Sequence, residues 1–151
     1  MNSYLVYRAS FYLMLIVASL ALVGDTAESQ FAKLYTLAVT VCGLAAFFMV
    51  DLHRRWALPR PLANALAVAT LGLLYLEYKV DDSQMIQSLG HWLIYLQLVK
   101  YFLPKTAEDD WFLFLLGLMQ VLIGSVVNQS DQVGTWLFLW AMLAVWVLGQ
   151  F

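Results

Sequence analysis

Six stretches without a Lys, Arg, Asp or Glu follow one another along the chain, and each is 16 to 20 residues long. They cover residues 9–24, 34–50, 61–76, 83–99, 111–130 and 132–151. At 1.5 Å per residue, a helix of about 20 residues crosses the roughly 30 Å hydrocarbon core of a bilayer. The spacing therefore predicts an all-α, polytopic integral membrane bundle of about six transmembrane helices.

The composition of the chain excludes most other classes of protein. Of its 151 residues, 63% are hydrophobic and 12% are charged, whereas an ordinary soluble domain is about half apolar and about a quarter charged. A soluble globular protein, a disordered tail and a nucleic-acid-binding protein are excluded together. Because little chain remains outside the six stretches, we expect one transmembrane domain over residues 1–151 and no soluble catalytic domain.

Flanking charges and prolines define the expected helices. These cover residues 4–23, 31–50, 61–78, 85–103, 110–127 and 133–151. Pro61 opens the third helix, since proline is accepted in the first helical turn, and Pro104 closes the fourth. The connections are short, and neither the 24–30 nor the 51–60 segment is a linker to another domain.

The distribution of basic residues predicts the orientation in the membrane. A cytoplasmic amino terminus places six basic residues on the inner side and only Lys33 and Lys79 on the outer side. The six are Arg8, Arg54, Arg55, Arg60, Lys100 and Lys105. This orientation obeys the positive-inside rule, and the reverse orientation breaks it.

Aromatic residues cluster near the expected helix ends. Amphipathic rings favour the headgroup layer of a bilayer, so these residues are predicted to be interfacial anchors. They are Trp56, Tyr75, Tyr78, Tyr101, Trp111 and Trp136. At the outer end of the third helix, Glu77 and Lys79 are expected to extend toward water and to need no functional role.

The fourth expected helix carries a semi-polar stripe. At 100° per residue, Gln87, His91 and Tyr95 fall within about 80° of one another, and Gln97 and Lys100 lie on a neighbouring sector. Polar groups are expensive in hydrocarbon, so each is a functional candidate. The stripe is consistent with a proton or ligand path, but hydrogen bonding between helices is the favoured interpretation.

No arrangement of residues for catalysis, metal binding or cofactor binding is found. A histidine within a membrane helix, such as His91, could ligate haem, but ligation by two histidines needs the second one on a facing helix. The second histidine, His53, is expected in an inner loop instead. The single cysteine, Cys42, sits in the middle of the second stretch and is best explained as a small buried apolar residue. We therefore expect no cofactor and no enzymatic activity within these residues.

The turn between the fourth and fifth helices combines basic and acidic residues. Lys100 and Lys105 flank the end of the fourth helix, and Glu108, Asp109 and Asp110 open the fifth. Acids are stabilised at a helix amino terminus by the helix dipole, and a short turn brings them beside the lysines. We predict a capped, charge-paired hairpin. Farther along the fifth helix, Gln120 adds another polar group.

Residues 90–106 read Gly-His-Trp-Leu-Ile-Tyr-Leu-Gln-Leu-Val-Lys-Tyr-Phe-Leu-Pro-Lys-Thr, and Leu-Met-Gln-Val follows at 118–121. This stretch resembles the membrane hairpin of bacterial TgpA-type transglutaminase-like proteins. That family has a histidine, a Leu-Gln-Leu-x-Lys run, a Pro-Lys-Thr turn, an Arg-Asp-Tyr triplet and Leu-Leu-Gln-Val on the fifth helix. Here Asp109 matches the triplet, whereas Glu108 stands in place of its arginine and Asp110 in place of its tyrosine, which reverses one charge.

The resemblance implies the amino-terminal membrane region of such a protein, in a bacterial cytoplasmic (inner) membrane. In that family the region precedes an extracytoplasmic transglutaminase-like domain with a Cys-His-Asp triad, and no such domain is present in these residues. The last stretch ends at Phe151 without a basic flank, which also leads us to expect a fragment of a longer chain.

Two functions follow as hypotheses, with a third less favoured. The first is a membrane-anchoring and interaction domain, and the second is a small non-catalytic subunit of a larger membrane complex. The third is a transporter or channel. The expected partners are membrane lipids, together with other membrane subunits or an extracytoplasmic domain, and no nucleic acid. The candidate interaction residues are His91, Tyr95, Gln97, Lys100, Lys105, Asp109 and Gln120.

Overall fold

The computed structural model describes residues 2–23, 30–53, 57–80, 85–128 and 131–150, and the regular structure in these ranges is entirely helical. The elements are α1 (Asn2–Val23), α2 (Gln30–Ala46), the π-helix η1 (Phe47–Leu52), α3 (Arg60–Val80), α4 (Met85–Tyr101), α5 (Ala107–Val127) and α6 (Asp131–Gln150). The η1 turn directly continues α2. The predicted all-α, six-helix architecture is confirmed.

Among the residues that the structure describes, five helical segments are long and apolar enough to cross a membrane. They are Ser3–Val23, Lys33–Leu52, Arg60–Val80, Ala107–Val127 and Asp131–Gln150. The remaining helix, α4, has 17 residues. It ends at Tyr101 rather than at the predicted residue 103, because Pro104 disfavours a helical conformation for the residue before it. In contrast, α5 begins earlier than predicted, because Thr106 caps its first turn.

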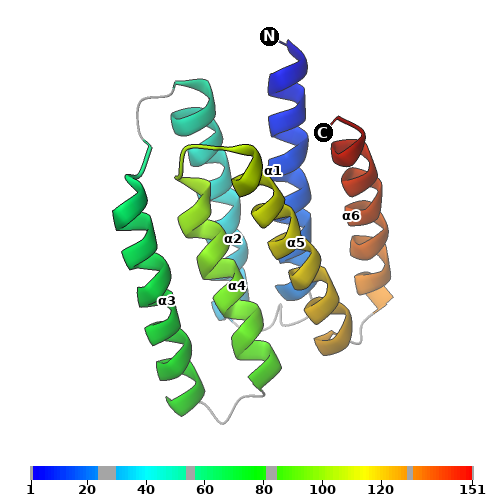
Figure 1. Cartoon of the computed structure of the whole chain (residues 1–151). Helices are drawn as coiled ribbons and strands as arrows, with labels where there is room; N and C mark the ends of the chain where they lie inside the picture. The colour runs from blue at the N-terminus through cyan, green and yellow to red at the C-terminus, as the bar shows by residue number, and fades with distance from the viewer. Residues whose placement is uncertain (1, 24–29, 54–56, 81–84, 129–130, 151) are drawn as a thin grey trace.

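The helices run alternately up and down and form a bundle around α1 (Figure 1). α1 packs against α2, α5 and α6, while α4 packs against α2, α3 and α5. α3 lies at one edge of the bundle and α6 at the other (Figure 1). The start of α1, the ends of α2 and α4 and the starts of α3 and α5 lie at one end of the bundle, which we call the α1-start end.

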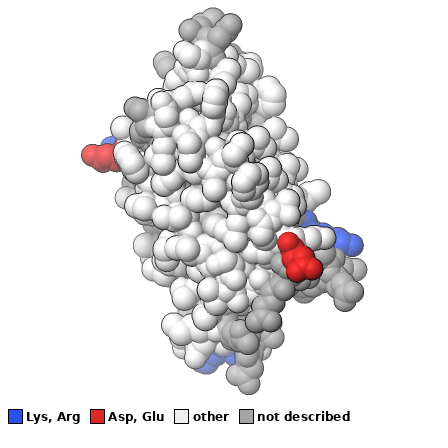
Figure 2. All heavy atoms as spheres, turned by 90° about the vertical axis from the view of Figure 1, so that its right-hand side faces the viewer, with Lys and Arg blue, Asp and Glu red and all other residues white. Residues whose placement is uncertain are grey.

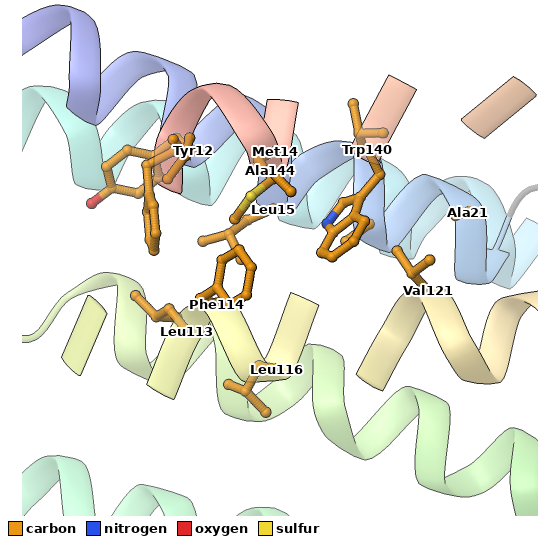
Figure 3. Packing of buried hydrophobic residues seen from close by; sticks show 14 of the residues in the cluster. Tyr12, Met14, Leu15, Ala21, Leu113, Phe114, Leu116, Val121, Trp140 and Ala144 are labelled. Atoms are coloured by element: carbon orange, nitrogen blue, oxygen red, sulfur yellow. The ribbon is translucent and has the colours of Figure 1, made fainter. Parts of the chain in front are cut away.

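The main core lies where α1 faces α5 and α6. Side chains from all three helices interdigitate there, with Leu15 on α1, Phe114 on α5 and Trp140 on α6 (Figure 3). The rings of Phe114 and Trp140 have centroids 6.0 Å apart. Close packing of this kind holds helices together in a bilayer, where apolar burial itself supplies little driving force.

α5 approaches α1 closely at Gly124. A Cβ atom built on Gly124 would lie 2.7 Å from the carbonyl oxygen of Ala21 and 3.0 Å from the Cα of Leu22. Only glycine allows the two backbones this separation. The contact is reinforced by Asn128, whose Nδ2 donates to the carbonyl oxygens of Ala21 and Leu22 at 2.9 Å each.

The outward surface of the bundle is apolar. Large hydrophobic side chains on α3 and α6 are exposed, among them Val68, Leu76, Phe138 and Val145. On the α6 side, most of the visible surface is uncharged, and only a few charged side chains are scattered on it (Figure 2). Such a surface suits contact with lipid and agrees with a multi-pass membrane protein.

Candidate functional site

A buried ionic cluster occupies the α1-start end. Nη1 of Arg8, on α1, donates to Oδ1 of Asp110, on α5, at 2.6 Å. Nε of Arg8 lies 3.7 Å from Oδ1 of Asp51, on η1, and the hydroxyl of Tyr12 donates to Oδ2 of Asp51 at 2.7 Å. The Arg8, Asp51 and Asp110 side chains are 3 to 7% exposed. We call these residues, with Lys105, the ionic cluster.

The π-helical turn η1 places Asp51 in the ionic cluster. In this turn the backbone N–H of His53 donates to the carbonyl oxygen of Phe48, five residues earlier, at 3.2 Å. A π-turn adds a residue to the helical repeat and so redirects the side chains that follow it. Asp51 consequently reaches Arg8 and Tyr12 on α1, and Val50 is buried beside it.

The α4–α5 hairpin forms as predicted, except in the role of Lys105. Nζ of Lys100 donates to Oδ1 of Asp109 at 3.1 Å. Thr106 and Asp109 form a reciprocal capping box at the start of α5. Nζ of Lys105 instead donates to the backbone carbonyl oxygens of Lys100, at 2.7 Å, and Tyr101, at 3.0 Å, and so caps the end of α4.

Burial lowers the pKa of Lys105 from 10.5 to about 8, and the nearby Asp51 only partly offsets this effect. The unfolded chain therefore binds the lysine proton more tightly than the folded bundle. The stability penalty for charging Lys105 is fully present below pH 8, and it is relieved as the pH rises toward 10.5.

Wild-type protein is accordingly expected to gain thermal stability relative to a Lys105→Met variant as the pH rises from 8 to 10. Methionine does not titrate. Subtracting the melting temperature of the variant from that of the wild-type protein therefore removes the pH effects that both proteins share. Melting temperatures in one detergent at pH 7.5, 9 and 10 measure the difference. A difference that stays constant or shrinks with rising pH would contradict the assigned pKa.

A second set of polar side chains, the interior group, lies inside the bundle between α1, α4 and α5. The hydroxyl of Ser19 is 3.4 Å from Oε1 of Gln97 and 3.1 Å from Oε1 of Gln120. Nε2 of Gln97 donates to the hydroxyl of Tyr101. Ser19, Gln97, Gln120 and Tyr101 are all buried. Within the described residues, Nε2 of Gln120 and Nε1 of Trp140 lack a hydrogen-bond acceptor.

A third set of polar side chains, the α2–α3–α4 group, joins these three helices at the other end of the bundle. Nδ1 of His91 hydrogen-bonds to Oε1 of Glu77 on α3. The ring of Tyr35, on α2, stacks on His91 at a centroid distance of 4.7 Å, and its hydroxyl shares a 2.6 Å hydrogen bond with that of Tyr95. These side chains, which come from three helices, contact one another between the helices.

The structure divides the sequence candidates among four places. His91 and Tyr95 lie in the α2–α3–α4 group, and Gln97 and Gln120 lie in the interior group between α1, α4 and α5. Lys100 and Asp109 lie in the hairpin, and Lys105 belongs to the ionic cluster. The prediction that Tyr101 is an interfacial anchor was wrong, since its side chain is fully buried. Trp56, another predicted anchor, lies outside the described residues. Glu77, which was expected to extend into water, instead pairs with His91.

The sequence interpretation missed the ionic cluster as a site. It used Arg8 only as an orientation signal and treated Asp51 as part of a loop. One signal was available, because a lone arginine inside an otherwise apolar membrane helix requires a buried counter-ion. The sequence did not indicate which acids would supply it, since Asp110 is 102 positions away.

The chain matches no protein-family model, no curated protein and no solved structure with which it was compared. Within the described residues, no group of three or more His, Cys, Asp and Glu side chains is arranged to hold a metal ion.

Proposed function

We propose that this chain is a non-catalytic, multi-pass membrane-anchoring and interaction domain with its amino terminus in the cytoplasm. The observation that carries the proposal is the bundle of apolar-surfaced helices, five of which are long enough to span a bilayer. The alternating helices bring Arg8, Arg60, Lys100 and Lys105 to the α1-start end and Lys33 and Lys79 to the opposite end (Figure 1). This distribution supports a cytoplasmic location for the α1-start end.

The contacts of the interior polar residues favour an anchor over a transporter. Ser19 lies within hydrogen-bond distance of both Gln97 and Gln120, and His91 and Tyr95 bond to side chains of neighbouring helices. Hydrogen bonds of this kind fix the relative positions of membrane helices. The contacts of His91, Tyr95 and Gln97 with neighbouring helices support the structural interpretation of the polar stripe predicted on the fourth helix over a solute path.

The resemblance of residues 90–121 to TgpA-type transglutaminase-like proteins supports a more specific version of the proposal. In this version, the chain anchors an extracytoplasmic transglutaminase-like domain in a bacterial inner membrane. The competing hypothesis is a small accessory subunit of a membrane complex. Reading the coding sequence beyond codon 151 separates the two, because an in-frame Cys-His-Asp domain would exclude the subunit and an immediate stop codon would exclude the anchor.

Cysteine labelling in intact cells tests both the membrane insertion and the orientation. In a Cys42→Ala background, Arg60→Cys and Lys79→Cys place single thiols at opposite ends of α3, where both native side chains are exposed. We expect a membrane-impermeant maleimide to label position 79 in intact cells and position 60 only after permeabilisation.

The reverse labelling pattern would overturn the proposed orientation. Extraction of the protein from membranes by alkaline carbonate would overturn the anchor itself, because a multi-pass bundle resists this treatment. The Cys42→Ala parent without an added cysteine measures the background labelling.

A further inference from the structure

A pocket of about 270 Å³ opens beside the ionic cluster. The described residues that line it come from the start of α1, from η1 and the segment after it, and from the α4–α5 turn. They are Tyr4, Val50, Asp51, Ala57, Pro104 and Lys105. The pocket thus combines one carboxylate, one ammonium and one phenol with an apolar wall at the end of a membrane-spanning bundle.

Lys105 differs from Arg8 and Lys100 in having no carboxylate partner among the described residues. Arg8 is paired with Asp110 and Asp51, and Lys100 with Asp109. Within the described part of the chain, no Asp or Glu oxygen lies within 4.0 Å of Nζ of Lys105, which instead donates to two backbone carbonyls. An ammonium has three N–H donors, so one remains for a ligand in the pocket.

The charge of the ionic cluster selects the kind of ligand that fits. Arg8 and Lys105 balance Asp51 and Asp110, so the cluster is neutral before anything binds. Within the described residues of the ionic cluster, an anionic ligand would add a negative charge close to two buried carboxylates without a further cation to balance it, which is unfavourable in a medium of low dielectric constant. A zwitterion that presents an anion to Lys105 and a cation to Asp51 preserves neutrality.

We propose that this pocket binds the phosphoethanolamine headgroup of a membrane phospholipid, with its phosphate on Lys105 and its ammonium on Asp51. The hydroxyl of Tyr4 already accepts a hydrogen bond from Nε of Arg8 at 3.1 Å, and its proton is available to the phosphate. Val50, Ala57 and Pro104 face the ethylene carbons. The pocket holds the equivalent of about nine water molecules, enough for a headgroup of about eight non-hydrogen atoms.

The location favours a lipid over a soluble zwitterion. The pocket lies at the ends of helices whose apolar surfaces contact lipid tails, at the depth where phospholipid headgroups occur. The inference requires insertion of the bundle in a bilayer, as proposed above, but it does not depend on which way the bundle faces.

Native mass spectrometry of the purified full chain tests the inference. The protein is incubated in mixed micelles with equal amounts of phosphatidylethanolamine, phosphatidylcholine and phosphatidylglycerol that carry the same acyl chains. We expect retention of phosphatidylethanolamine about tenfold above either competitor, which corresponds to one hydrogen bond to a charged group. Choline has no N–H to donate to Asp51, and glycerol has no positive charge.

Two variants should abolish binding of the headgroup by different means. Lys105→Met deletes the phosphate-binding cation, and Ala57→Trp fills the pocket without altering a charge, so a folding defect in the first leaves the second informative. Both should lower phosphatidylethanolamine retention to that of phosphatidylcholine. Lys100→Met, which breaks the neighbouring ion pair outside the pocket, should leave the selectivity unchanged.

Equal retention of the three lipids would overturn the inference, as would undiminished selectivity in Ala57→Trp. Displacement of the lipid by millimolar free phosphoethanolamine would assign the pocket to a soluble ligand and overturn the lipid assignment. Failure of the protein to enter micelles or bilayers would instead contradict the membrane anchor, so the two proposals fail in distinguishable ways.

Discussion

Replacing Arg8 with methionine is expected to destabilise the folded bundle by about 3–5 kcal/mol, the usual effect of removing one partner from a buried ion pair. The Arg8 side chain is 6% exposed and contacts both Asp110 and Asp51. Methionine preserves much of the apolar stem but leaves two buried carboxylates without their cation. Tyr12 still donates to Asp51, and the hydroxyl of Tyr7 lies 3.5 Å from Oδ2 of Asp110, but neither phenol supplies a positive charge.

Thermal or denaturant unfolding in a single detergent measures this effect, and the chain supplies a matched control. Lys100→Met breaks the pair with Asp109, whose side chains are 27% and 17% exposed, and should change stability by less than about 1 kcal/mol. The double variant Arg8→Met with Asp110→Asn should recover part of the loss, because it also removes the stranded charge. Equal stability of Arg8→Met and Lys100→Met would contradict the role assigned to the ionic cluster.

Substituting Gly124 with alanine should separate α1 from α5 where the two backbones come close together. The added methyl group would lie 2.7 Å from the Ala21 carbonyl oxygen, and backbone atoms cannot yield as a flexible side chain does. The overpacking is expected to destabilise the bundle by about 1–3 kcal/mol, and by more if the two bonds from Asn128 to the end of α1 are also broken.

Two other helical glycines separate this clash from the general effect of alanine. A Cβ atom at Gly72, on α3, or at Gly134, on α6, meets nothing within 4 Å. Gly72→Ala and Gly134→Ala should therefore leave the bundle unchanged or stabilise it by up to about 1 kcal/mol through helix propensity. If Gly124→Ala has the same melting temperature as these two control variants, the contact between α1 and α5 is not tight.

Local features of this protein were predictable because the interactions that produce them are local. In hydrocarbon, each backbone N–H and C=O must be bonded within its own segment, so an apolar stretch of sufficient length becomes a helix wherever it packs. The α4–α5 hairpin was predictable for a similar reason, since Lys100 and Asp109 are nine positions apart. The end of α4 was placed two residues too late, because the conformational effect of Pro104 on its predecessor was not included.

Contacts between distant segments were not predictable from the same patterns. Ser19 meets Gln97 and Gln120 from 78 and 101 positions away, and Glu77 meets His91 only because α3 and α4 pack side by side. Tyr101 shows the limit of prediction from local position. Its place at a helix end indicated a location in the headgroup layer, whereas packing against Tyr12 buries its side chain.

A bundle of apolar helices with a charged hairpin follows from local sequence, because helix formation and short turns depend on neighbours within a few residues. The acids that neutralise Arg8, the direction that the π-turn gives Asp51 and the place of Lys105 in a pocket beside them follow from tertiary packing. These outcomes depend on which helix faces meet. Shape complementarity and the pairing of buried charges across 100 residues set those contacts, and no local pattern encodes them.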